Sequence, residues 1–327
     1  MGLSVGCDGR TWALNEARLS RPLSPLAASV EFAAFSVPVR YFRQLRFETA
    51  FRLGERLGAV AYVLALPQRK TAMVNLRIAF PEKPDQERRA ILRESCRNFG
   101  RVAAEWCHMR RLTAANVAER VTFADPGFWY GEAQRIMASS GILVLTGHFG
   151  NWELFAHATG LYGNPVHLVH RPFRNPRFDA FVNAERQRSG TTLISKRRAA
   201  AQVVRVLRGG GIVAIPFDQN ATGRWGVFAD FFGVPASTHP GLARLHELSQ
   251  APVYPVFLVR QGGTPSHQIV ILPRVETVRS GAHDADTVEN TRRFNRVLED
   301  VVRAHPEQWI WMHKRWRTRP PGDPPIY

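Results

Sequence analysis

The sequence predicts an α/β fold: a mostly parallel mixed sheet with flanking helices, preceded by a helical N-terminal segment. Two observations lead to this prediction. From about Gly141 onward, short runs of β-branched residues alternate with segments of helical periodicity, a pattern typical of parallel sheets with helical crossovers. Before that point, from about Ala27 to Arg111, apolar residues recur at helical spacing and prolines punctuate the segments.

The N-terminal third divides into an extension and a helical segment. Residues 1–25 are polar and proline-containing and are expected to be loose. Residues 26–111 are expected to form membrane-associating helices, the longest at 87–109. Residues 112–327 hold the α/β core, and 26–327 are expected to form one structural unit.

The α/β part is predicted as alternating elements. Strands are expected at 142–148, 166–172, 191–195, 212–218, 253–259 and 269–275. Helices are expected at 151–161, 176–188, 198–208, 240–250 and from Asp286, with a capping-box start, to about Ala304. The last two strands flank a Gly-rich turn and are expected to form an antiparallel hairpin. Ligands of such sheets bind beyond the carboxyl ends of the strands.

The large positive charge of the chain predicts an anionic partner. The 327 residues include 44 Lys and Arg against 27 Asp and Glu, a formal net charge of +17. Nucleic acid, an anionic membrane face, an acidic protein and phosphorylated substrates all fit this charge. A solvated basic surface with no special partner is the plain alternative. The 3 cysteines are too few for a disulfide framework, so we expect the chain to fold in a reducing compartment. They also lack the spacing of a zinc site.

No segment is long enough to be a convincing membrane span. The best stretch, residues 57–66, is apolar but is flanked by charged residues and prolines, and a span needs about 20 apolar residues. The N-terminus does not have the pattern of a signal peptide. Two interpretations stay open for this stretch: a helix lying in the membrane interface and a buried core helix.

The stretch at residues 146–158 carries the strongest chemical signal. His148 ends a predicted buried strand, Gly150 permits a tight turn, and Asn151 is a good N-cap for the next helix. Glu153 lies in the first helical turn, so the turn can bring its carboxylate to the imidazole of His148. Such a pair makes a general base for a hydroxyl that attacks an activated acyl group. An ordinary surface or core ion pair is the competing interpretation.

No metal site and no resident cofactor are expected. His167 and His170 are three apart on a predicted strand and point to opposite faces, so they cannot chelate together. The common zinc-protease, serine-hydrolase and phosphate-loop motifs are absent from the sequence.

The segment GHFGNWE resembles the H-x4-[D/E] box of glycerolipid-type acyltransferases, and the chain is most similar to the lipid A biosynthesis (lauroyl/myristoyl-type) acyltransferase family. Four more blocks resemble that family in the same order, at 69–82, 169–179, 217–238 and 305–320. The resemblance implies a glycerol-3-phosphate acyltransferase-like fold. It also implies that His148 is the general base, oriented by Glu153. By geometry alone, the backbone N–H groups of Gly150 and Asn151, at the N-terminus of the predicted helix, are candidates for stabilising the oxyanion.

Further substrate-binding residues are expected at the ends of other strands. Arg171 is a candidate phosphate clamp, with a surface salt bridge to Asp179 as the alternative. Asp218 is expected to orient Arg171 or to bind the acceptor, together with Gln219, or else to form a turn.

Further candidates for substrate binding each have a competing structural interpretation. Asn175 is a candidate contact to substrate or a helix cap. Arg224 and the loop at 228–235 are expected to line an acyl groove or to pack in the core. The basic and aromatic block at 309–319 fits lipid phosphates at a membrane interface or stacking on single-stranded nucleic acid, and the resemblance favours lipid.

The expected reaction is transfer of a fatty acyl group from an acyl-carrier-protein thioester to a hydroxyl of a lipid A precursor. The acyl carrier protein is acidic and matches the charge of the chain. The expected location is the cytoplasmic face of the bacterial inner membrane, held peripherally or by a single N-terminal anchor. One alternative is an acyl-CoA-dependent enzyme acting on another glycolipid or phospholipid, such as a phosphatidylinositol mannoside. A basic, non-catalytic nucleic-acid-binding protein is a second alternative, which would leave His148 and Glu153 without a purpose.

Overall fold

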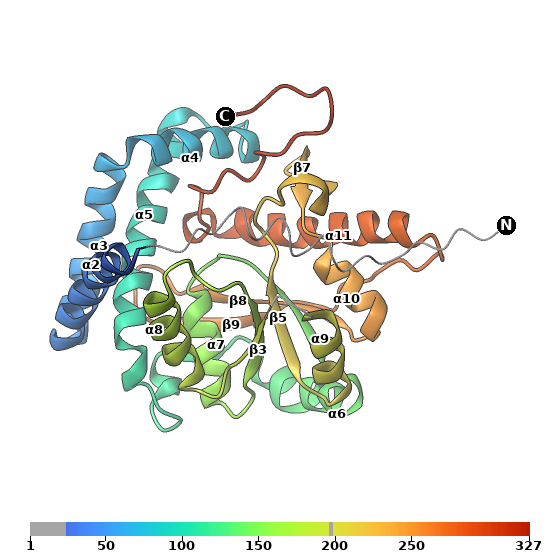
Figure 1. Cartoon of the computed structure of the whole chain (residues 1–327), viewed down its shortest axis with the longest axis horizontal. Helices are drawn as coiled ribbons and strands as arrows, with labels where there is room; N and C mark the ends of the chain where they lie inside the picture. The colour runs from blue at the N-terminus through green and yellow to red at the C-terminus, as the bar shows by residue number, and fades with distance from the viewer. Residues whose placement is uncertain (1–23, 196–198) are drawn as a thin grey trace.

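A seven-stranded sheet lies at the centre of the computed structural model, which describes residues 24–195 and 199–327, and helices cover both of its faces (Figure 1). The strand order is β1-β9-β8-β2-β5-β3-β4. The bounds are β1 Val121–Phe123, β2 Ile142–Thr146, β3 Val166–His170, β4 Thr192–Ser195, β5 Ile212–Pro216, β8 Val253–Arg260 and β9 His267–Ile271. Strands β8, β2, β5, β3 and β4 run parallel, whereas β9 is antiparallel to β8. The predicted mixed sheet and its antiparallel hairpin are confirmed.

The central strands are apolar along most of their length because helices cover the sheet on both sides. Every residue of β2 and of β8 is buried, and strands buried on both faces have near-continuous apolar sequences. Because β8, β2 and β5 are parallel neighbours, their carboxyl ends lie side by side at one edge of the sheet.

The helices of the α/β part lie within a few residues of their predicted positions. They are α7 Trp152–Leu161, α8 Pro176–Gln187, α9 Ala199–Arg208, α10 Gly241–Ser249 and α11 His283–Ala304. One further helix, α6 Gln134–Ser140, precedes them at a position where the sequence does not predict one. The predicted start of the last helix is wrong by three residues. The carboxylate of Asp286 lies inside α11 and accepts hydrogen bonds from the backbone N–H and the hydroxyl of Ser280, at 2.8 and 2.7 Å. It therefore holds the loop before the helix and is not the N-cap.

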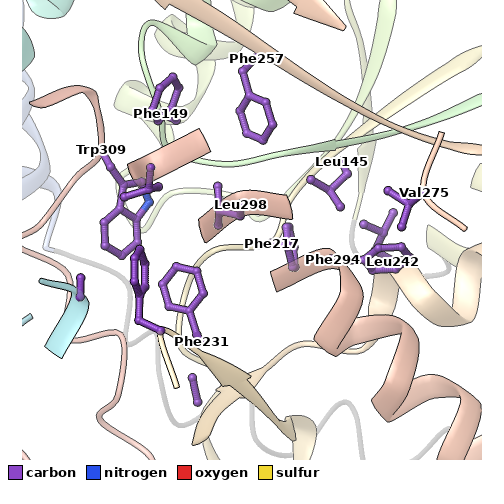
Figure 2. Close-up of a cluster of buried hydrophobic side chains, with 14 of the residues drawn as sticks. Leu145, Phe149, Phe217, Phe231, Leu242, Phe257, Val275, Phe294, Leu298 and Trp309 are labelled. Carbon is purple, nitrogen blue, oxygen red and sulfur yellow. The ribbon is translucent and has the colours of Figure 1, made fainter. Parts of the chain in front are cut away.

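The segment expected as a loop at 228–235 is a second, two-stranded sheet. Strands β6 Val227–Phe231 and β7 Val234–Thr238 pair antiparallel through a tight turn. Phe231 is fully buried and contacts Trp309 and Trp316, at 5.6 Å between ring centroids in both cases. Figure 2 shows Phe231 beneath Trp309 in the hydrophobic core. Of the two alternatives for this segment, the structure shows core packing for Phe231 and Phe232, whereas Phe228 and Val234 are half-buried.

Four helices precede the sheet: α2 Pro25–Gln44, α3 Phe47–Leu64, α4 Leu66–Ala79 and α5 Asp85–His108. They form the block at the left of Figure 1, and α5 is the long helix predicted at 87–109. Helices α3 and α5 meet through glycines. A Cβ on Gly58 would come within 2.2 Å of the carbonyl oxygen of Cys96, and one on Gly54 within 2.4 Å of that of Gly100. Most of the expected loose extension lies outside the described residues.

Within residues 24–195 and 199–327, none of the helices combines the length and the apolar character needed to cross a bilayer.

Candidate active site

Three neighbouring strands bring polar side chains to one edge of the sheet. His148 follows the end of β2, Asp218 follows the end of β5, and Arg260 is the last residue of β8. These strands are hydrogen-bonded in the order β8-β2-β5, so their carboxyl ends converge where α/β sheets bind their ligands.

The imidazole of His148 is held by Asp218. Its Nδ1 lies 2.8 Å from Oδ1 of Asp218, and the backbone N–H of His148 donates to Oδ2 at 2.9 Å. A carboxylate only accepts hydrogen bonds, so the proton of the neutral ring is on Nδ1 and the lone pair is on Nε2. The amide nitrogen of Gln219 lies 3.4 Å from this Nε2. The side chain of His148 is 26% exposed.

The surroundings of Asp218 keep it ionised although it is completely buried. Burial alone would raise the pKa of its carboxyl, but the charge of His148 and three hydrogen bonds outweigh that effect and hold the pKa well below its ordinary value. The third of these bonds comes from the indole N–H of Trp309, at 3.0 Å from Oδ2. Burial likewise opposes the charged form of His148, but the charge and hydrogen bond of Asp218 raise the pKa of His148 above its ordinary value.

The imidazole of His148 is hydrogen-bonded to Asp218 and not, as expected, to Glu153. The carboxylate of Glu153 instead forms a two-point ion pair with Arg186 on α8, with Nε of Arg186 2.9 Å from Oε2. The negative charge of Glu153 still acts at a distance and contributes to the raised pKa of His148. Because Asp218 takes the position expected for Glu153, the local spacing of the H-x4-E box did not identify the partner of the imidazole.

The turn between β2 and α7 requires glycine at position 150. Gly150 has a φ of +56°, and a Cβ there would come within 1.9 Å of the carbonyl oxygen of Leu258. Its N–H donates to the carbonyl oxygen of Gln308 at 2.8 Å. This N–H is therefore engaged, which corrects the expectation that it is available to an oxyanion. Asn151 is fully buried and caps α7 by accepting from the N–H of Leu154 at 3.0 Å, as predicted.

The remaining predicted site residues are dispersed. Arg171 is exposed directly after β3, at the same sheet edge as His148. Asn175 is buried and caps α8, and its amide donates to the carbonyl oxygen of Ala28 on α2 at 2.8 Å. It thus joins two helices rather than contacting His148. Arg224 lies in a short 3-10 helix, Gly223–Trp225, and its side chain is outside the described part of the structure.

The tryptophans of the C-terminal block, expected as part of a lipid- or nucleic-acid-binding surface, lie in the core, whereas Lys314 and Arg317 are exposed. Trp309, Trp311, Trp316 and Arg315 are each at most 1% exposed. The guanidinium of Arg315 donates to Ser237 and Thr238, and burial lowers its pKa to about 10. Sequence reasoning missed that this block supports the site through Trp309, since no local pattern links Trp309 to a carboxylate far earlier in the chain.

An apolar cavity of about 220 Å³ lies between α3 and α5. Its lining includes Leu57, Gly58, Phe99, Gly100 and Met312. A smaller hollow shares Phe99 and Met312 with this cavity and is also lined by Trp152 and Trp309, which contact His148 and Asp218 respectively. This hollow has a volume of only about 10 Å³, and its lining also includes the polar side chains of Ser95, Asn98 and Gln308. Within the described ranges, no group of three or more His, Cys, Asp or Glu side chains is arranged to hold a metal ion.

The comparisons with known proteins agree with this architecture. The family model of the bacterial lipid A biosynthesis acyltransferases matches residues 32–318, and the chain belongs to that family. It is 26% identical over 293 residues to the lipid A biosynthesis palmitoleoyltransferase of Escherichia coli K12, covering 87% of this chain and 90% of that protein. The lauroyltransferase of the same strain is 29% identical over 292 residues, with the same coverage. Its myristoyltransferase is 27% identical over 268 residues, covering 82% and 81%. The chain is therefore an O-acyltransferase.

Proposed function

We propose that this enzyme transfers a fatty acyl group from a thioester donor to a hydroxyl of a lipid A precursor, with His148 as the general base. The observation that carries the proposal is the hydrogen bond between Nδ1 of His148 and the buried carboxylate of Asp218. It leaves the basic Nε2 on the accessible side of the ring, at the ligand-binding edge of the sheet. The names of the relatives supply the acceptor class, since they are lipid A biosynthesis acyltransferases.

The reaction is a direct transfer without an acyl-enzyme. Nε2 of His148 takes the proton of the acceptor hydroxyl as its oxygen attacks the thioester carbonyl carbon. Asp218 stabilises the imidazolium that forms. The tetrahedral intermediate collapses with cleavage of the C–S bond, and the imidazolium returns its proton to the leaving thiolate. The products are an ester and a free thiol. General-base catalysis of this kind contributes about 10²- to 10⁴-fold in rate.

The N-terminus of α7 is the candidate oxyanion site. The first N–H groups of a helix have no partner within the helix, and Asn151 satisfies only that of Leu154. The N–H groups of Trp152 and Glu153 lie in the same first turn, next to His148. They and the positive end of the helix dipole would stabilise negative charge on the thioester oxygen.

The apolar cavity between α3 and α5 is the proposed place for the donor acyl chain. Its walls are almost wholly apolar, and it shares Phe99 and Met312 with the smaller hollow that is lined by Trp152. Arg171, exposed at the same sheet edge, is the proposed contact for a phosphate of the acceptor or of the donor's pantetheine arm. Arg171→Ala should chiefly raise the KM for that phosphorylated partner, and a loss of kcat alone would contradict this role.

The proposed donor is an acyl-carrier-protein thioester. The net charge of +17 favours an acidic partner. Acyl-CoA is the alternative donor, and assaying both donors in parallel decides between them.

Helices α2 and α3 are proposed to lie on the anionic cytoplasmic face of the bacterial inner membrane. Their exposed apolar side chains include Leu26, Val30, Leu57, Val60 and Leu64, and exposed arginines accompany them at positions 40, 52 and 56. Each basic residue near such a surface adds about 1 kcal/mol of attraction.

Mass spectrometry of lipids tests the proposed function. Lipid A from cells that contain the protein should be heavier by one acyl chain than lipid A from cells that lack it. A difference on another lipid class, or on none, would contradict the proposed acceptor. The purified enzyme, supplied in parallel with acyl-carrier-protein and CoA thioesters of the same chain, then identifies the donor.

A further inference from the structure

We propose that Glu105, held by Arg260, is a positioning residue for His148 and acts through the side chain of Asn151. The inference rests on the proposed role of His148 as the base. Glu105 lies on α5 and contacts neither the imidazole nor Asp218. Glu105 would affect kcat by holding residues 147–151, the segment that carries His148, in position.

Glu105 is part of a buried ion pair behind that turn. Its side chain is 4% exposed and that of Arg260 is 1% exposed. The two groups make hydrogen bonds of 2.6 and 2.8 Å, and Nε of Arg260 also donates to Asn98 at 2.7 Å. Burial opposes the charge of Glu105, but the nearby His267 and Arg260 and the hydrogen bonds to it keep its pKa lowered. A buried ion pair is often no more stabilising than apolar side chains of the same volume, so stability alone does not account for it.

The ionised carboxylate fixes which way the amide of Asn151 faces. Nδ2 of Asn151 donates to Oε2 of Glu105 at 2.8 Å, while its Oδ1 accepts from the N–H of Leu154 at 3.0 Å. Because a carboxylate can only accept, the amide nitrogen must face Glu105 and the oxygen must face α7. The N-cap of α7, which is Asn151, three residues after His148, is thereby held against α5.

A second connection runs from Arg260 to the same turn. The backbone N–H of Arg260 donates to the side chain of Gln308 at 2.8 Å, and the Gln308 amide donates back to the Arg260 carbonyl at 3.0 Å. The carbonyl of Gln308 accepts from Gly150, and the next residue, Trp309, donates to Asp218. The Glu105–Arg260 pair thus supports the His148 turn on one side and the Asp218 carboxylate on the other.

The decisive variant is Asn151→Ser. Serine remains a good N-cap, but its hydroxyl lies one bond nearer the main chain than Nδ2 and does not reach Glu105. Glu105 loses this one hydrogen bond but keeps its ion pair with Arg260, so the protein should stay folded. We expect kcat to fall about ten- to a hundredfold with both KM values unchanged, because a small displacement of the base suffices for such a loss. Melting temperature should change little.

Glu105→Gln and the double variant test whether the two residues act together. Glu105→Gln should lower kcat in the same way, and the double variant should be no slower than the slower single variant. Glu94→Gln is the matched control. It removes a carboxylate 2.7 Å from the buried Arg101 on the same helix but has no link to the turn, so its kcat should match the wild type. If Glu105→Gln does not fold, Asn151→Ser alone decides the question.

Two results would overturn the inference: an Asn151→Ser enzyme with wild-type kcat, or single losses that multiply in the double variant. His148→Ala is measured in the same assay with an acyl-carrier-protein thioester and a lipid A precursor. If His148→Ala is inactive while Asn151→Ser turns over normally, the positioning role fails and the proposed function stands. If His148→Ala turns over normally, the role of His148 as the base fails.

Discussion

At the scale of single residues, the site depends on a carboxylate that lies 70 positions beyond the histidine it orients. Asp218 is fully buried, accepts from the ring and backbone of His148 and from Trp309, and stays ionised. Glu153 is nearer in sequence but is engaged by Arg186. The two acidic residues therefore make different contributions: Asp218 fixes the tautomer of the imidazole, and Glu153 adds a background negative charge.

Asp218→Asn should change both the rate and its pH dependence. The proposed base, His148, must be neutral to act, so kcat/KM of the wild type should fall as pH decreases through a pKa above the ordinary value for histidine. Removing the charge of Asp218 lowers that pKa, so the fall moves to lower pH. The plateau itself should drop by about 10²-fold or more, because the ring loses its fixed tautomer. The measurement is kcat/KM against pH.

Glu153→Gln is the control for this experiment, because it also removes a negative charge near His148. It should shift the pH profile less than Asp218→Asn, since Glu153 makes no hydrogen bond to the ring in the structure. A larger shift for Glu153→Gln would show that Asp218 is not the main partner.

Gly150→Ala should destabilise the protein more than Gly163→Ala. Both glycines have positive φ, +56° and +83°, so both substitutions carry backbone strain of about 1–3 kcal/mol. Only at position 150 does the new Cβ also meet a backbone carbonyl, that of Leu258 at 1.9 Å, whereas nothing lies within 4 Å at position 163. Urea unfolding of both variants measures the difference. Equal losses would mean that the turn can move away from β8.

At the scale of elements, the strand order creates the site and the helix packing creates the cavity beside it. Parallel pairing of β8, β2 and β5 brings their carboxyl ends together. Helices α3 and α5 approach closely at Gly54, Gly58 and Gly100, and two of these glycines also line the apolar cavity. The distance between the two helices therefore sets the width of the proposed acyl site.

Gly58→Ala should force α3 and α5 apart. The added Cβ would lie 2.2 Å from the carbonyl oxygen of Cys96, which is backbone and can move only with its helix. Overpacking of this kind costs about 1–3 kcal/mol, and the preference for donor chain length should change with it. Gly131→Ala, where the new Cβ meets nothing within 4 Å, is the control. Thermal unfolding and a series of donor chain lengths test both effects, and a Gly58→Ala enzyme identical to the wild type would contradict the close packing.

At the scale of the whole molecule, the proposed contact with an anionic membrane would use both the basic charge of the chain and the exposed apolar side chains of α2 and α3. Leu64 on α3 is 73% exposed, in a helix block at one side of the sheet (Figure 1). The aromatic and basic C-terminal block does not contribute its tryptophans to such a surface, because they are buried in the core.

Binding to vesicles should require anionic lipid and weaken with salt, because exposed charges are screened over about 8 Å at physiological ionic strength. Leu64→Glu should weaken it further by placing a charge in the apolar face. Leu248→Glu, at a residue 59% exposed on α10, should bind like the wild type. Co-sedimentation with phosphatidylglycerol and phosphatidylcholine vesicles makes the measurement, and equal loss for the two variants would contradict membrane contact through α3.

Much of this architecture follows from the sequence, and the exceptions have a common physical cause. Apolar runs such as 142–146 and the position of His148 after them are local features, so the central strands and the site edge could be predicted. The partner of His148 depends on which strands are neighbours, because β5 pairs with β2 only in the folded sheet. The burial of Trp309 and Arg315 is likewise decided by tertiary packing, which overrides the aromatic and basic pattern of their segment.

The turnover of purified His148→Ala, with folding verified by its melting temperature, tests the central claim most directly. If Nε2 of His148 removes the proton of the acceptor hydroxyl, kcat should fall by about 10²- to 10⁴-fold while the KM values stay close to those of the wild type. A folded His148→Ala enzyme with near-normal kcat would contradict the account.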